Sequence, residues 1–349
     1  MFQDFFPIGL GSAGLSGNFP GYSFGHIEET MATNIIDACF HSNIKIIDCA
    51  PVYGLGEAEK RVGKALKTLG LREKIFLTSK SGVSWTPQGR IYKSNEPKLA
   101  IQMLEDSLKR LQTDYIDLYF IHWPDPHYDI RYCFESLLKE KNKGKIRFLG
   151  LCNTTQEDYL KALELGEVSC VQAEWNLWCP SETFVQKYPV PTFSSLSEKQ
   201  EKNPSFMSWG ILDKGILTQT VTATRHFEEY DCRKKAPWWK ARPLSLLYRL
   251  VEEEIRPLAA TLFPESDHPL LNCAVFYNLL TTPHSSVHLC GLKTLEQLKD
   301  LLNVVNFFQL LKEKERLTIQ EDLSLLSSFL FSKIQEEANK HKAHNHRPS

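Results

Sequence analysis

The segment IKIIDCAPVYG, residues 44–54, decides the fold. Its β-branched run predicts a strand over residues 44–48, and this strand ends in Asp48, shortly before Tyr53 and a glycine. The same order recurs along the chain, where apolar runs that end in a polar residue precede segments of helical period. Such alternation predicts βα units around a parallel sheet.

Eight apolar runs of this kind predict eight strands. They are IGLG (8–11), IKIID (44–48), IFLTSK (75–80), IDLYFIH (116–122), FLGLC (148–152), SCVQA (169–173), FMSW (206–209) and SVHLC (286–290).

The intervening segments carry apolar residues on one helical face, and no Pro/Ser-rich linker divides the chain into two domains. We therefore predict one α/β domain over residues 1–335, a (β/α)₈ TIM barrel with a C-terminal helix, and a polar, disordered tail over 336–349. An open eight-stranded sheet is the alternative. The long stretches 179–204 and 218–243 are expected to be functional loops.

Composition and charge exclude several classes of function. The 349 residues are 42% hydrophobic and 24% charged with a formal net charge of −1, which is typical of a soluble protein without a nucleic-acid partner. No apolar run approaches the roughly 20 residues of a membrane span. The nine cysteines form no CxxC pair, which argues against disulfides and structural zinc. We expect a cytoplasmic monomer or weak homo-oligomer that binds neither a membrane nor a metal.

In a barrel of this type, the C-terminal ends of the strands meet at one rim, where the chemistry takes place. Three consecutive predicted strands bring Asp48, Lys80 and His122 to that rim, and Tyr53 lies just beyond Asp48. Taken singly, each residue has a simpler explanation, such as a turn cap, a surface charge or a buried histidine. Together they indicate an active site.

These four side chains suit the reduction of a carbonyl group. An ammonium at Lys80 would lower the pKa of Tyr53, and Asp48 would hold that ammonium in place. A neutral His122 would donate a hydrogen bond to the substrate oxygen that Tyr53 protonates. The sequence offers neither a nucleophile beside a base nor a ligand cluster for a catalytic metal, so acyl transfer and metal catalysis are disfavoured.

At these residues the sequence resembles the aldo-keto reductase family. IIDCAPVYGLGEAEKRVGKAL is similar to its pattern D-x-A-x-x-Y-G followed by G-x-x-E, and FLTSK and DLYFIHWPDP are similar to its lysine and histidine strands. GKIRFLGLCNTT, VQAEWNLW and CGLKTLEQLKDLL resemble its later cofactor segments, and the likeness runs in order from about residue 8 to 305.

The resemblance implies a (β/α)₈ barrel that binds NADP(H), with NAD(H) as the open alternative. It implies that the protein reduces a small aldehyde or ketone, or oxidises the corresponding alcohol. Tyr53 would be the general acid/base, tuned by Lys80 and Asp48, and His122 would orient the substrate. Asp231 and Arg233 resemble a D-x-R element whose loop folds over the cofactor in some members.

The resemblance also implies contacts with the cofactor and the substrate. Asn153 and Gln172 would hold the nicotinamide carboxamide, Trp209 would stack on its ring, and Leu212 would also contact the cofactor. The adenosine end would lie against Lys293, Thr294 and Gln297, and the substrate against Trp85 and Trp123.

Several positions depart from the family pattern. The usual serine of the G-x-S-N segment is Cys152, and the S-P-L segment after the seventh strand reads GIL. The asparagine that closes the adenine segment is Leu301, and no arginine stands beside Lys293. The family's N-terminal hairpin looks truncated, so we expect the barrel bottom to be covered by another segment or by Phe2, Phe5 and Phe6.

Two other functions fit part of the sequence. A cofactor-binding regulator or subunit with little turnover, like the potassium-channel β-subunits of this family, would keep the cofactor segments. It would not need Tyr53 and Lys80 in register, so the intact set of four residues favours an enzyme. A phosphate-binding barrel of another chemistry would bind no nicotinamide at all.

Overall fold

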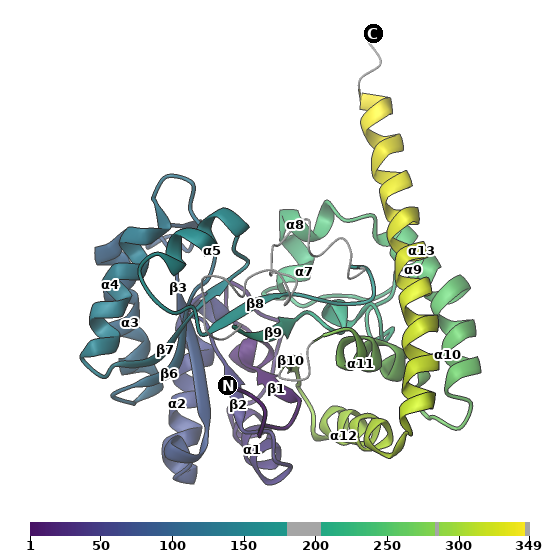
Figure 1. The fold of residues 1–349 in the computed structure, drawn as a ribbon, viewed down its shortest axis with the longest axis horizontal. Coiled ribbons are helices and arrows are strands. Elements are labelled where there is room, and N and C mark those ends of the chain that lie inside the picture. The colour runs from purple at the N-terminus through teal and green to yellow at the C-terminus, as the bar shows by residue number, and fades with distance from the viewer. Residues whose placement is uncertain (180–203, 283–285, 346–349) are drawn as a thin grey trace.

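The computed structural model describes residues 1–179, 204–282 and 286–345, so most of the loop expected over 179–204 lies outside the described residues. Eight parallel strands close into a barrel in the order β1-β10-β9-β8-β7-β6-β3-β2, with helices around it (Figure 1). The predicted (β/α)₈ barrel is confirmed. Its strands are β1 (Ile8–Gly11), β2 (Ile46–Asp48), β3 (Phe76–Ser81), β6 (Ile116–Ile121), β7 (Ile146–Cys152), β8 (Cys170–Glu174), β9 (Ser205–Trp209) and β10 (Ser286–Gly291).

The strands differ from the predicted ones by one or two residues at their ends. Strand β2 begins at Ile46 rather than at residue 44, because the N–H of Ile44 donates to the Cys39 carbonyl at 2.9 Å and so closes the turn after helix α1 (Glu29–His41). Strand β6 ends at Ile121, one residue before His122. These shifts leave the residues predicted for the rim at the C-terminal ends of the strands.

The helices cover the outside of the barrel, and several of them bury one apolar face. In α2, for example, Val62, Ala65 and Leu66 are buried while Lys60 and Lys67 are exposed. A π-helical turn joins α9 to α10. Besides α1, the helices are α2 (Glu57–Leu69), α3 (Pro97–Leu111), α4 (Ile130–Asn142), α5 (Gln156–Leu163), α7 (Cys232–Lys235), α8 (Pro237–Lys240), α9 (Leu244–Leu250), α10 (Arg256–Leu262), α11 (Pro269–Thr281), α12 (Leu295–Leu310) and α13 (Glu313–Asn345).

Aromatic residues from the N-terminus pack with the apolar core inside the barrel. Phe2 is buried, and its ring lies 6.1 Å from that of Phe5 and 5.7 Å from that of Phe76, measured between centroids. Phe2 and Phe5 join the inward-facing cluster that contains Leu118. Phe6 packs against the separate outer core.

Helix α13 runs to Asn345 and projects past the barrel (Figure 1). A disordered tail was predicted from residue 336, and that prediction does not hold as far as residue 345. The pairs Lys333–Glu336 and Glu337–Lys340 lie one turn apart along the helix, at 3.5 and 3.9 Å, and such pairs support helix without tertiary packing. Within the described part of the chain, no helix combines the length and apolar character that a membrane crossing requires.

Candidate active site

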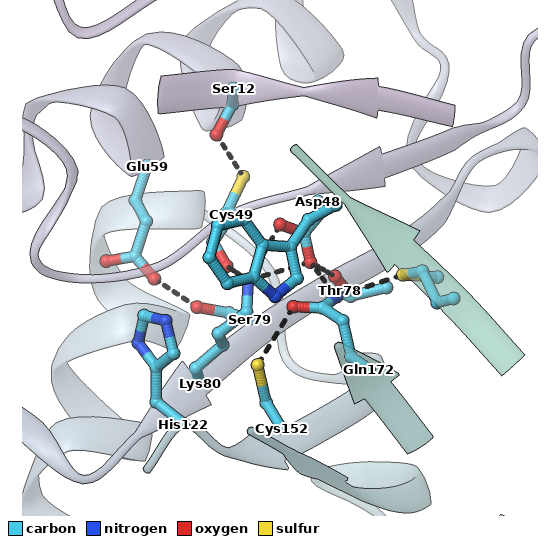
Figure 2. Close-up of polar contacts among 12 residues, drawn as sticks. Ser12, Asp48, Cys49, Glu59, Thr78, Ser79, Lys80, His122, Cys152 and Gln172 are labelled. Carbon is cyan, nitrogen blue, oxygen red and sulfur yellow. Dashed lines mark hydrogen bonds and ion pairs between the residues drawn. The ribbon is translucent and has the colours of Figure 1, made fainter. Parts of the chain in front are cut away.

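A buried ion pair forms the base of the candidate site. Lys80 Nζ donates to both carboxylate oxygens of Asp48, at 2.8 and 2.7 Å, and to the carbonyl of Cys49 at 2.8 Å (Figure 2). Thr78 and Gln172 donate to the same carboxylate, at 2.7 and 2.9 Å. Because Lys80 is fully buried and its ammonium bonds three oxygens, the pair holds one fixed position at the C-terminal ends of β2 and β3.

The alternation of strand β3 explains why this pair forms. Thr78 and Lys80 lie two residues apart, on the inner face of the strand, where both reach Asp48. Ser79 points outward and donates to Glu59 of α2 at 2.6 Å (Figure 2). Arg110 of α3 donates to the other oxygen of Glu59 at 2.7 Å. A second buried carboxylate therefore fixes the strand from outside, a role that we did not predict.

Tyr53 lies over the ion pair. Its turn requires the glycine that follows it, because Gly54 has φ 61° and an added Cβ would meet the Cβ of Ser16 at 2.7 Å. The Tyr53 ring centroid lies 5.3 Å from Lys80 Nζ and 6.5 Å from the centroid of the His122 ring. The acid, the phenol, the lysine and the histidine predicted to form one site are thus brought together.

The pKa of Tyr53 differs from the prediction. Burial and then the charge of Asp48 raise the pKa of Tyr53 well above its ordinary value of 10.0. We expected Lys80 to lower this pKa, and that expectation is wrong for this geometry. Lys80 does not offset these two effects, because both oxygens of Asp48 bind its ammonium.

The surroundings of His122 favour its neutral form. Burial lowers its pKa well below 6.5, and the charges of Lys80 and Lys93 lower it further. Its backbone N–H donates to the Ser81 carbonyl at 2.9 Å, which sets the residue at the rim directly after β6. A neutral imidazole retains one N–H that can donate to a substrate oxygen.

Asn153, Gln172 and Trp209 continue the site along the next strands. Trp209 Nε1 donates to Asn153 Oδ1 at 3.1 Å, and Asn153 stands in the left-handed region with φ 53°. Cys152, which replaces the expected serine, is buried; its thiol donates to Gln172 Oε1 at 3.2 Å and accepts from Asn153 Nδ2 at 3.1 Å. The Cys152 thiol therefore joins Asn153 and Gln172, the two residues predicted to contact the nicotinamide carboxamide.

A continuous cavity of about 600 Å³ leads away from these residues. It begins at Asp48 and Tyr53, passes Trp209 and Leu212, and ends near the start of α12. Volumes of 300 to 1,000 Å³ are typical of small-molecule and cofactor sites. Residues at its far end include Lys293, Gln297, Asp300 and Leu301.

The far end of the cavity matches the predicted adenosine contacts in part. The N–H of Lys293 donates to Gln297 Oε1 at 2.8 Å, and Lys293 Nζ donates to the Phe24 carbonyl at 2.8 Å. Thr294 caps α12, accepting from the Gln297 N–H at 3.2 Å, but it does not line the cavity. The first N–H groups of a helix have no partner within it, so this end suits an anion.

Two arginines that the sequence analysis missed also line the cavity. Arg225 comes from the loop after β9 and Arg256 from α10, and both share the cavity with Lys293. We noted that no arginine stands beside Lys293 in the sequence; in the fold, the charge of Arg225 is near enough to affect the pKa of Lys293. No sequence signal marks either arginine, because tertiary packing alone brings them there.

The segment 218–243, predicted to be a functional loop, contacts the segment that follows β1. Arg233 donates to both carboxylate oxygens of Asp231, at 2.9 and 2.6 Å, and its guanidinium lies 5.0 Å from the Phe24 ring centroid. The N–H of Cys232 donates to the Ser23 carbonyl at 2.9 Å. Arg233 and Phe24 line the cavity, so the predicted D-x-R element lies over it.

Aromatic rings continue from Tyr53 toward solvent. Tyr22 lies 5.8 Å from Tyr53 and 5.9 Å from Trp238 between ring centroids, and Trp238 is 40% exposed. Lys214 lies between Trp209 and Trp238, with its Nζ 5.3 and 5.9 Å from their centroids. Neither Tyr22 nor Lys214 was predicted, and Lys214 has φ 56° in the turn after β9.

The two tryptophans predicted for the substrate pocket occupy different elements. Trp123 stacks on His122, with centroids 6.5 Å apart and an interplanar angle of 29°. Trp85 was predicted to lie in a loop, and that prediction is wrong. It lies in β4 (Val83–Trp85), which pairs with β5 (Ile91–Lys93) as a hairpin. The run VSWTPQGRIYK carried the signal, because two β-rich runs flank a Pro/Gly turn.

The chain is similar to known proteins along most of its length. A family model described as the aldo/keto reductase family matches residues 7–321. The chain is 30% identical over 300 residues to the aldo-keto reductase YhdN of Bacillus subtilis, which covers 86% of this chain and 85% of that protein. It is 26% identical over 265 residues to an NADH-specific methylglyoxal reductase of Escherichia coli, with 72% of this chain and 77% of that protein covered.

Further similarities concern cofactor and fold. An aldo-keto reductase of Schizosaccharomyces pombe, whose name includes NADP(+), is 30% identical over 231 residues, 66% of this chain and 65% of that protein. The structure of a glycerol dehydrogenase from Gluconobacter oxydans superimposes with a TM-score of 0.69 at 24% identity, covering 92% of each chain. At that identity the match bears on the fold alone.

Proposed function

This chain belongs to the aldo/keto reductase family and is an oxidoreductase, and on that premise we propose that it reduces an aldehyde or ketone with NADPH. The observation that carries the proposal is the cavity that joins Asp48 and Tyr53 to Lys293 and Gln297. A cofactor of this kind supplies a hydride when bound. The lining of the cavity includes the indole of Trp209 and cations such as Lys293.

We assign the proton transfer to Tyr53. Because burial raises its pKa, this phenol stays protonated at neutral pH and can donate to the oxygen of a carbonyl as that oxygen gains charge. The neutral imidazole of His122 would donate a second hydrogen bond to the same oxygen. Lys80 and Asp48 would fix the position of Tyr53 from below.

We propose roles in cofactor binding for the other residues that were predicted to contact it. Asn153 and Gln172 would bond the nicotinamide amide, and Trp209 would lie against the nicotinamide ring. Leu212 would lie beside the phosphates, as a lining residue of the cavity. Thr294, outside the lining, would act indirectly by capping α12.

We propose NADP(H) rather than NAD(H) as the cofactor. The relatives include one named for NADH and one named for NADP(+), so the family alone leaves the choice open. The far end of the cavity gathers Lys293, Arg225 and Arg256, and three cations suit the extra phosphate of NADP(H). Asp267 and Asp300 line the same end and oppose this preference in part.

We also keep a cytoplasmic location and a monomer or weak homo-oligomer as proposals. Seven of the nine cysteines are buried, and burial raises the pKa of Cys39 and Cys133 to about 12. Such thiols react slowly and suit a reducing compartment.

A turnover assay in both directions tests the proposed reaction. Oxidation of NADPH and of NADH would be followed with a panel of aldehydes and ketones, and reduction of both oxidised cofactors with the matching alcohols. We expect turnover, with NADPH preferred. The alternative, a cofactor-binding regulator, predicts tight NADPH binding without turnover. Binding would be measured by quenching of tryptophan fluorescence, with Trp209→Leu as the variant that weakens it.

A further inference from the structure

One face of the β4–β5 hairpin points toward the candidate catalytic residues. In the antiparallel register, Val83 lies opposite Lys93 and Trp85 lies opposite Ile91. Directly opposite residues share a face of the hairpin, as do residues two apart on one strand. These four side chains therefore project together.

The buried member of this set shows where the face points. Val83 belongs to a buried cluster with Ala50 and Val52, and Tyr53 and Trp123 pack against that cluster. The other members of the face are more open to solvent: Ile91 is 44% exposed and Trp85 is half-buried. An apolar surface that borders a catalytic site and remains open to solvent suits the apolar body of a substrate.

Lys93 places a positive charge on this face of the hairpin. Its Nζ lies 4.3 Å from the ring centroid of Trp123, and Trp123 in turn stacks on His122. Among the residues that the structure describes, no carboxylate lies within ion-pair distance of Lys93, whereas Lys80 and Lys214 of the same site bond Asp48 and Glu174. Lys93 is therefore a cation near the reaction centre whose charge is not compensated.

We propose that Lys93 makes the enzyme prefer carbonyl compounds that carry an anionic group, such as a carboxylate, at the far end of a flat apolar body. The carbonyl oxygen would lie at Tyr53 and His122, the flat body would lie along Trp123 and Trp85, and the anion would meet the ammonium. This inference rests on the proposed reduction. Lys93 is exposed, so the contact would lie at the solvent edge of the site, and a charge-assisted contact there distinguishes charged from neutral substrates.

Two aldehydes of one shape isolate the charge. 4-Formylbenzoate and 4-formylbenzamide differ by one negative charge, and the ratio of their kcat/KM values measures the preference. We expect the wild-type protein to favour the benzoate by about tenfold, the equivalent of one charge-assisted contact. The ratio should fall to about one in Lys93→Gln and below one in Lys93→Glu. Arg90→Gln, which removes an exposed charge from the turn of the same hairpin, is the matched control and should keep the wild-type ratio.

Two results would overturn the inference. One is a ratio that stays unchanged in Lys93→Gln, and the other is an equal fall in Arg90→Gln, which would indicate only the general field of the protein. Absence of turnover with both aldehydes would contradict the proposed function instead. In that event, calorimetric titration of the NADPH-loaded protein gives the same comparison by binding: a benzoate preference that depends on Lys93 supports the inference, and equal binding of the two compounds rejects it.

Discussion

The two halves of the candidate active site are held together in different ways. The inner half is buried, and its side chains hydrogen-bond around one carboxylate; it consists of Asp48, Thr78, Lys80 and Gln172. The outer half is half-buried or exposed, and its rings meet at centroid distances of 5.8 to 6.5 Å; it consists of Tyr22, Tyr53, His122 and Trp238. Among the described residues, no side-chain hydrogen bond joins two members of the outer half.

This difference separates the residues that support the structure from those that carry out the chemistry. Strands β2, β3 and β8 set the inner half, so a change there should reduce both stability and activity. Turns and loops set the outer half, which faces the cavity, so a change there should alter catalysis or binding more than folding.

The largest effect is expected from Lys80→Met. It leaves the Asp48 carboxylate buried without its counter-ion, and breaking a buried pair in this way costs about 3–5 kcal/mol. Denaturant unfolding would measure the loss, and turnover should disappear as well. Lys64→Met removes a surface partner of Glu29 and should change the unfolding free energy little. Equal behaviour of the two variants would remove the distinction between the inner half and the surface.

Thr78→Val should have the next largest effect. It keeps the shape of the side chain but removes the hydroxyl that donates to Asp48 at 2.7 Å. Loss of a buried hydrogen bond to a charged group costs about 2 kcal/mol. Thr78→Ser retains the hydroxyl and should lie closer to the wild type in the same unfolding experiment. If Val is tolerated better than Ser, packing rather than the hydrogen bond supports the carboxylate.

The pH dependence of stability should reveal His122. Burial and then Lys80 and Lys93 lower its pKa, and burial lowers that of His288 to about 3. The unfolded chain protonates both near pH 6.5, so their contribution is complete above that pH and is lost as the pH falls below it. Each should add a slope of up to about 1.4 kcal/mol per pH unit to the unfolding free energy between pH 6.5 and 5. His122→Gln should flatten this slope.

The control for the pH experiment is His41→Gln, because the His41 side chain is 70% exposed. It should leave the slope of the unfolding free energy as it is in the wild type. A slope that responds to His41→Gln but not to His122→Gln would mean that the imidazole at the rim is not held neutral by its surroundings.

Trp238→Leu should have the smallest effect on folding. Its indole is 40% exposed and meets Tyr22 only through ring contact, which is worth about 1 kcal/mol or less. KM for the carbonyl substrate should rise by more than this stability change suggests, because the indole continues the row of rings that leads from Tyr53 through Tyr22 toward solvent. A loss of stability as large as that of Lys80→Met would show that the outer half is also a structural support.

The sequence predicted the inner half better than the outer half, for a physical reason. Strand period and strand ends are local properties, so Asp48, Lys80 and Gln172 could be placed once a barrel was predicted. Tyr22 and Lys214 reach the site through turns with unusual backbone angles, and Arg225 reaches it through tertiary packing; no local pattern encodes those positions. The direction of the Tyr53 pKa shift depends on how deeply the phenol is buried and on the charge of Asp48 beside it. Both depend on the three-dimensional structure.

The central claim is that Tyr53 donates the proton, while the inner half only holds the Tyr53 side chain in position. Tyr53→Phe removes one hydroxyl, and Tyr92→Phe removes the same group from the opposite face of the β4–β5 hairpin, where Tyr92 is 39% exposed. NADPH oxidation, NADPH binding and urea unfolding would be measured for both variants. We predict that Tyr53→Phe lowers kcat by about 10²–10⁴-fold with binding and unfolding close to wild type, and that Tyr92→Phe changes none of the three. Retained turnover in Tyr53→Phe would contradict the account.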